Sequence, residues 1–188
     1  MILLLLVLMF HSPQQDRILF VGDSMTAYSN GWQHQFAKQI GCQYTNLSVS
    51  GKRTSWMLQT LRSHLQTDSN YKACFIYGGI NDGFAHVKTQ SAIDNIQSMV
   101  DLCNSMGIEP VVIMGYNPCT VMTNLRTANA DFHVNRYVQI QDMMSSLQNC
   151  KLITIADTIT RQDSDDGIHF RASGHRKFSQ WVLKHYSK

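Results

Sequence analysis

Ser24 is the first residue whose type and position could do chemistry. It lies in the segment 22–26 (GDSMT), directly after the run 17–21 (RILFV), which has the composition of a buried parallel strand. Ligands in open α/β sheets bind at the carboxyl ends of the strands. Ser24 is therefore a candidate nucleophile, although Asp23 and Ser24 are also residue types that cap a following helix.

A hydroxyl nucleophile needs a general base within hydrogen-bond reach and a third group that holds the base. The segment 163–169 (DSDDGIH), which precedes the last predicted helix, contains both. Asp166 and His169 are three residues apart, so one tight turn can aim the carboxylate at one imidazole nitrogen while the other faces Ser24. The spacing indicates a triad of Ser24, His169 and Asp166.

The same acidic loop allows a second interpretation, because Asp163 and Asp165 also lie near His169. The run lacks the twelve-residue spacing and the terminal Glu of an EF-hand, so we expect no metal site. The other histidines have no comparable partner, and His133 and His175 are expected to be surface or capping residues.

Acyl transfer also needs hydrogen-bond donors for the negative charge that develops on the carbonyl oxygen. Three are available, the backbone N–H groups of Ser24 and Gly51 and the side-chain amide of Asn81. Each follows a different predicted strand. Their convergence predicts an oxyanion hole.

Four segments, in this order, resemble the SGNH hydrolases, also called GDSL esterases and lipases. They are 22–24 (GDS), 48–51 (SVSG), 79–82 (GIND, matching G-x-N-D) and 166–169 (DGIH, matching D-x-x-H). The resemblance covers residues 17–182. The G-x-S-x-G elbow of α/β-hydrolases is absent, because Thr26 stands where its second glycine would be.

The resemblance implies Ser24 as nucleophile, His169 as general base and then acid, and Asp166 as the partner that orients His169. Gly51 and Asn81 would complete the oxyanion hole with Ser24. It also implies a flavodoxin-like sandwich with a five-stranded parallel sheet. Our leading hypothesis is an acyl-enzyme mechanism without metal or organic cofactor.

Strands and helices that could position these residues alternate along the chain. Apolar runs predict strands at 17–21, 44–49, 73–77, 111–114 and 152–155. Helical spacing of apolar residues predicts helices over 32–40, 56–65, 93–107 and 132–147, and a last one after residue 169. This alternation predicts an α/β fold, a three-layer α/β/α sandwich with a parallel sheet.

The composition is typical of one globular domain without a nucleic-acid partner. The chain has 188 residues, 44% of them apolar and 15% charged, and its net charge of +3 comes from scattered Lys and Arg. The five cysteines are widely spaced and contain no C-x-x-C pair, which argues against a zinc cluster or a disulfide framework.

Residues 1–10 are wholly apolar and unlike the rest of the chain. A ten-residue helix spans about 15 Å, half of a bilayer core, so we expect no transmembrane span. A removed leader, a buried or oligomer-facing element and a true start at Met9 remain open. We expect an apolar segment at 1–14 followed by one domain at 15–188. The segment favours a secreted or envelope location, a cytoplasmic one stays open, and the oligomeric state is undetermined.

Aromatic residues near the predicted site bear on the substrate. Tyr28, Trp32 and Trp56 follow the first two catalytic turns and could stack on sugar rings, although aromatic residues at helical spacing are more often core. Tyr116 lies in the segment 115–130, which has no clear period and could be a loop that shapes the acyl pocket.

Lys52 and Arg53 directly follow Gly51, which indicates either an anionic substrate or a solvated pair. The loop around Tyr116 contains no long apolar run that would indicate a deep lipid groove. We therefore expect a serine esterase for short acyl groups, most simply O-acetyl on a carbohydrate. The alternatives are a thioesterase or lysophospholipase acting on longer acyl chains, and a non-catalytic carbohydrate-binding module on the same fold.

Overall fold

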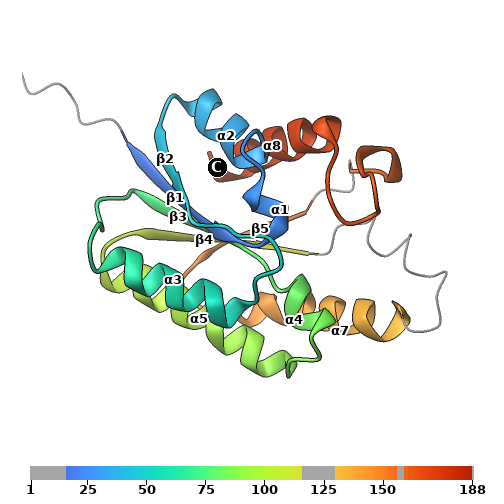
Figure 1. Cartoon of the computed structure of the whole chain (residues 1–188). Helices are drawn as coiled ribbons and strands as arrows, with labels where there is room; N and C mark the ends of the chain where they lie inside the picture. The colour runs from blue at the N-terminus through green and yellow to red at the C-terminus, as the bar shows by residue number, and fades with distance from the viewer. Residues whose placement is uncertain (1–15, 116–129, 156–158, 188) are drawn as a thin grey trace, which may run out of the picture.

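A five-stranded parallel sheet forms the centre of the computed structural model, which describes residues 16–115, 130–155 and 159–187, without the side chains of 130–136 (Figure 1). Its strand order is β2-β1-β3-β4-β5, and every neighbouring pair is parallel. The strands are β1 (Arg17–Gly22), β2 (Gln43–Asn46), β3 (Ala73–Tyr77), β4 (Glu109–Met114) and β5 (Lys151–Thr154). The sheet confirms the predicted α/β fold.

Helices cover both faces of the sheet (Figure 1). One face carries α2 (Trp32–Ile40) and α8 (Ala172–Tyr186), and the other carries α3 (Thr54–Leu65), α5 (Thr89–Ser105) and α7 (Ala130–Met143). The connections in the described ranges contain the short helices α1 (Ser24–Ala27) and α4 (Ile80–Phe84) and the 3₁₀ turns η1 (Met144–Ser146) and η2 (Arg161–Asp163). The predicted three-layer sandwich is therefore confirmed.

Side chains of the central strand, β3, belong to two separate hydrophobic cores, one on each face of the sheet. Cys74 and Ile76 of β3 belong to the cluster under α3 and α5, whereas Phe75 and Tyr77 belong to the cluster under α2 and α8. All five residues of β3 are buried, as expected for a parallel strand covered on both faces. This explains why β3 is a continuous apolar run.

Trp32 is part of the second core. Its side chain is 0% exposed, and its ring makes an edge contact with Phe20 at a centroid distance of 5.4 Å. Its Nε1 donates to the carbonyl of Met25 at 3.2 Å, so its polar atom is also satisfied inside the protein. The expectation that Trp32 could stack on a sugar is therefore wrong, because helical spacing marked a core position.

The second strand ends earlier than predicted, at Asn46 instead of residue 49. The Asn46 side chain donates from Nδ2 to the carbonyl of Thr26 at 2.8 Å, and its Oδ1 accepts from the backbone N–H of Ser48 at 3.0 Å. Past Asn46 the backbone N–H groups of Leu47 and Val49 still donate to Phe20 and Gly22 of β1, so the side-chain bonds of Asn46 shape this segment alongside those contacts. The predicted 132–147 helix likewise ends at Met143, where η1 follows.

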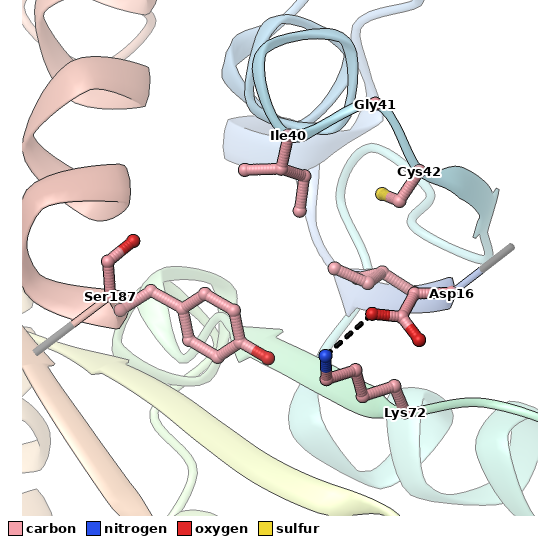
Figure 2. Close-up of a pocket in the computed structure, with 8 residues that line it drawn as sticks. Asp16, Ile40, Gly41, Cys42, Lys72 and Ser187 are labelled. Atoms are coloured by element: carbon pink, nitrogen blue, oxygen red, sulfur yellow. Dashed lines mark hydrogen bonds and ion pairs between the residues drawn. The ribbon is translucent and has the colours of Figure 1, made fainter.

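A pocket of about 270 Å³ lies at the amino ends of the strands (Figure 2). An ion pair of 2.6 Å between Asp16 and Lys72 borders it. This pocket is at the opposite end of β1 from Ser24, whereas α/β proteins bind ligands at the carboxyl ends of the strands.

None of the helices in the described ranges is long and apolar enough to cross a bilayer. The 1–14 and 15–188 division stays a prediction.

Candidate active site

Ser24 lies where β1 turns into α1. Gly22 ends the strand, and a Cβ at this position would collide with the carbonyl oxygen of Tyr77 on β3, so only glycine lets the two strands approach. Asp23 is the N-cap of α1, and its carboxylate accepts from the backbone N–H of Met25 at 3.0 Å. The turn fixes Ser24, which is 7% exposed, at the first helical position.

The loop before α8 brings His169 to Ser24. His169 Nε2 is 2.9 Å from Ser24 Oγ, and His169 Nδ1 is 2.6 Å from Asp166 Oδ2. Such a line of contacts lets the carboxylate hold the Nδ1–H tautomer, which leaves Nε2 free to accept the hydroxyl proton. The structure thus brings together the three residues of the predicted triad.

Asp166 is itself clamped by its turn. Its Oδ1 accepts from the backbone N–H groups of Ile168 and His169, each at 2.8 Å. Burial acts to raise the pKa of Asp166, but the hydrogen bonds from His169 and Ile168 outweigh it and lower the pKa to about 2. The carboxylate is therefore ionised at neutral pH.

The other two aspartates of the loop have different partners. Asp163 is 2% exposed, and its Oδ2 accepts from Lys177 Nζ at 2.6 Å and from Thr160 N and Oγ1 at 3.0 Å. Asp165 pairs with Arg171 Nε at 2.5 Å. Asp163 anchors α8 to η2 and Asp165 is taken by Arg171, which leaves Asp166 as the carboxylate that contacts His169.

The turns after β2 and β3 carry the other two predicted donors. Gly51 has a φ of 75°, a left-handed conformation that favours glycine. Asn81 is the second residue of α4, and its Nδ2 donates to the carbonyl of Lys52 at 3.1 Å and over a longer 3.4 Å to Asp23 Oδ2. Because β2, β1 and β3 are neighbours in the sheet, their carboxyl ends place Gly51, Ser24 and Asn81 in adjacent turns.

Two buried carboxylates support these turns. Asp23 is fully buried, and burial, with a smaller effect from Asp82, raises its pKa to about 7. Asp82 is 1% exposed and accepts from the backbone N–H and the hydroxyl of Thr54 at 2.9 and 2.7 Å, which fixes the start of α3. Sequence reasoning missed Asp82, although an acidic residue directly after Asn81 in the motif was a usable signal.

The substrate-contact candidates lie in different environments. Tyr28 is 48% exposed and lines a pocket of about 230 Å³ with Ser24, Ala27 and Ser50. Its ring centroid is 6.1 Å from that of His169. Trp56 is half-buried, and Lys52 Nζ lies 5.3 Å from the centre of its ring. Tyr116 and the rest of the 116–129 segment lie outside the described residues.

His175 differs from the prediction in one respect. It is 6% exposed, so a surface location is wrong, but its Nδ1 accepts from the backbone N–H of Trp32 at 3.2 Å and caps α2 from α8. Burial, helped by the nearby His169, lowers its pKa to about 4, so it is neutral at pH 7. The side chain of His133 lies outside the described residues.

Residues 20–177 match the model of the GDSL-like lipase/acylhydrolase family. The chain belongs to this family. The match confirms the resemblance to the GDSL esterases and lipases and spans all four motif segments. A comparison with the curated proteins found no match.

Solved structures share the GDSL-like fold. The psychrotrophic esterase EstA from Pseudoalteromonas sp., described as inhibited by monoethylphosphonate, superposes with a TM-score of 0.72 at 16% identity, over 92% of this chain and 97% of that chain. A lipolytic protein of the G-D-S-L family from Veillonella parvula gives 0.71 at 18% identity, over 92% and 98%. The acetyl xylan esterase AlAXEase gives 0.69 at 15% identity, over 89% and 98%. At these identities the likeness shows the fold alone.

Proposed function

We propose that this protein is a serine esterase that hydrolyses carboxylic esters through an acyl-enzyme on Ser24. The observation that carries the proposal is the line of contacts from Ser24 Oγ through His169 to Asp166, at 2.9 and 2.6 Å. A serine, an imidazole and a carboxylate at these distances form the arrangement that activates a hydroxyl.

In the first half-reaction, Ser24 Oγ bonds to the carbonyl carbon while its proton passes to His169 Nε2. The tetrahedral intermediate then collapses, the ester C–O bond breaks, and His169 gives the proton to the leaving alcohol. In the second half-reaction, His169 takes a proton from water, whose oxygen attacks the acyl group. Breaking the bond to Ser24 releases the acid, and the proton returns to Ser24 Oγ.

The negative oxygen of both intermediates would accept hydrogen bonds from Ser24 N, Gly51 N and Asn81 Nδ2. One N–H of Asn81 is held by the carbonyl of Lys52 at 3.1 Å, whereas the contact with Asp23 is long at 3.4 Å. The long contact can be exchanged for a shorter bond to the oxyanion as charge develops. The amide would then stabilise the transition state more than the ground state.

Short acyl groups, most simply O-acetyl on a carbohydrate, are the substrates that we propose. The pocket formed by Ser24, Ala27, Tyr28 and Ser50 has a volume of about 230 Å³, below the range usual for drug-sized ligands. The half-exposed Tyr28 ring on its wall offers a surface for a sugar. An acetyl xylan esterase is among the structures with this fold.

A chain-length series tests both activity and acyl preference. Purified protein would be assayed for nitrophenol release from acetyl, butyryl and octanoyl esters, with Ser24→Ala as the control. Serine-dependent turnover that is fastest on acetyl supports the proposal. Fastest turnover on octanoyl would favour the thioesterase or lysophospholipase alternative. Absence of turnover, with carbohydrate binding that survives Ser24→Ala, would favour a binding module.

A further inference from the structure

Three carboxylates of the described residues at the candidate site accept hydrogen bonds from protein groups at both oxygens. Both oxygens of Asp166 accept hydrogen bonds from its own turn and from His169. The two oxygens of Asp82 accept from Thr54, and those of Asp23 accept from Met25 and Asn81. None of them has an oxygen without a protein donor.

Two cations on the turn after Gly51 have no carboxylate partner within the described ranges. Arg53 is exposed and forms no ion pair there, although its charge is close enough to influence Asp82. Lys52 forms no ion pair with any described carboxylate, and its Nζ lies 5.3 Å from the centre of the Trp56 ring. Around the loop that carries His169, Arg171 and Lys177 are paired with Asp165 and Asp163, and Arg161 donates to the carbonyl of Ser164.

Lys52 and Arg53 are tied directly to the catalytic turns. Ser50 lines the pocket with Ser24. Lys52 is two residues after Ser50, so the Cα atoms of Ser50 and Lys52 are at most about 8 Å apart. The carbonyl of Lys52 accepts from Asn81 Nδ2, which holds this backbone against the amide proposed for the oxyanion hole. The contact with Trp56 restrains the Lys52 ammonium, which lowers the entropy lost when it binds an anion.

We propose that Lys52 and Arg53 form a subsite for an anionic group on the ester substrate, such as the carboxylate of an acidic sugar. This inference rests on the proposed esterase function and specifies its substrate as a negatively charged ester. Trp56 is a positioning residue that holds Lys52, which is a different role from the sugar stacking expected from the sequence.

Two matched esters separate the subsite from the chemistry. One is an acetoxynitrobenzoate, and the other is the acetate of the same nitrophenol without its carboxylate. Because acyl group and chromophore are shared, the ratio of their kcat/KM values reports recognition of the charge. We expect the parent protein to prefer the anionic ester by at least about fivefold, mainly through a lower KM, with the preference falling as salt is added.

Lys52→Gln and Arg53→Gln should each reduce this ratio, and the double variant should bring it close to one. Arg62→Gln is the matched control, because Arg62 is an exposed cation near the other end of α3. A parent ratio near one, or a ratio that the double variant leaves unchanged, would overturn the subsite while ester turnover itself upholds the esterase. Absence of turnover on either ester would overturn both.

Discussion

Asp163 and Asp166 are three residues apart on one loop, yet they have opposite surroundings. Asp163 is buried between Lys177 and Thr160, whereas Asp166 is half-exposed at the side-chain level and contacts His169. Both aspartates were candidates near His169 in the sequence. The capping box between Thr160 and Asp163 decides the assignment, because it turns the Asp163 side chain into the protein.

Replacing each aspartate by asparagine should therefore affect a different property, kcat for Asp166 and the free energy of unfolding for Asp163. Asp166→Asn should keep the thermal stability but lower kcat roughly ten-thousandfold, because the amide no longer holds the required imidazole tautomer. Asp163→Asn should lower the free energy of unfolding by about 1–3 kcal/mol and leave kcat nearly unchanged. Paired melting curves and kinetics would show this, and a greater kcat loss in Asp163→Asn would contradict the assignment.

Asn81 should matter to the transition state more than to substrate binding. Asn81→Ala should lower kcat about a hundredfold or more with little change in KM, since one oxyanion donor is lost. Asn95→Ala is the matched control, because Asn95 also donates an amide N–H in this region, but to Thr54 Oγ1. Equal kcat losses in the two variants would argue that Asn81 acts through local structure only.

Strong periodic or continuous apolar patterns made the larger elements predictable. The continuous run of β3 and the spacing over α2 gave the observed bounds, and Gly41 ends α2 with a φ of 67°. The short helices α1 and α4 have four and five residues, too few to show a period. Long-range side-chain bonds, such as the one from Asn46 to the carbonyl of Thr26, also leave no local signal.

The α2–α8 pair depends on a contact that no local pattern indicates. His175 of α8 caps the first N–H of α2, and its ring contacts Tyr28 at 5.5 Å between centroids. His175→Phe keeps the packing but removes the acceptor. We expect it to cost about 1–2 kcal/mol of unfolding free energy at pH 7, measured by denaturant titration. Unchanged stability would show that the cap contributes nothing.

At the scale of the whole molecule, two buried groups give stability opposite pH dependences. The pKa of Asp23 is raised to about 7, so the native state binds more protons than the unfolded state between about pH 4 and 7, and stability falls as pH rises. The pKa of His175 is lowered to about 4, so stability rises as pH rises from about 4 to 6.5. The two effects partly cancel in the parent protein.

Removing either Asp23 or His175 should leave the pH dependence of the unfolding free energy that the other residue causes. The unfolding free energy of Asp23→Asn should rise by about 2–3 kcal/mol between about pH 4 and 6.5, where His175 acts. Above pH 7 this variant should be more stable than the parent protein, because it lacks the buried charge of Asp23. His175→Phe should lose stability with rising pH, on the order of 4 kcal/mol. Urea unfolding from pH 4 to 8 tests this, and parallel curves for all three proteins would contradict it.

The most direct test of the central claim is covalent labelling by a phosphonate ester, located by peptide mass spectrometry. We predict one label on Ser24 at pH 7, because an activated serine attacks the phosphorus. His169→Ala should slow labelling by several orders of magnitude, whereas Ser29→Ala, at an exposed serine five residues along the chain, should label normally. A Ser24 that stays unmodified, or that reacts equally fast without His169, would contradict the account.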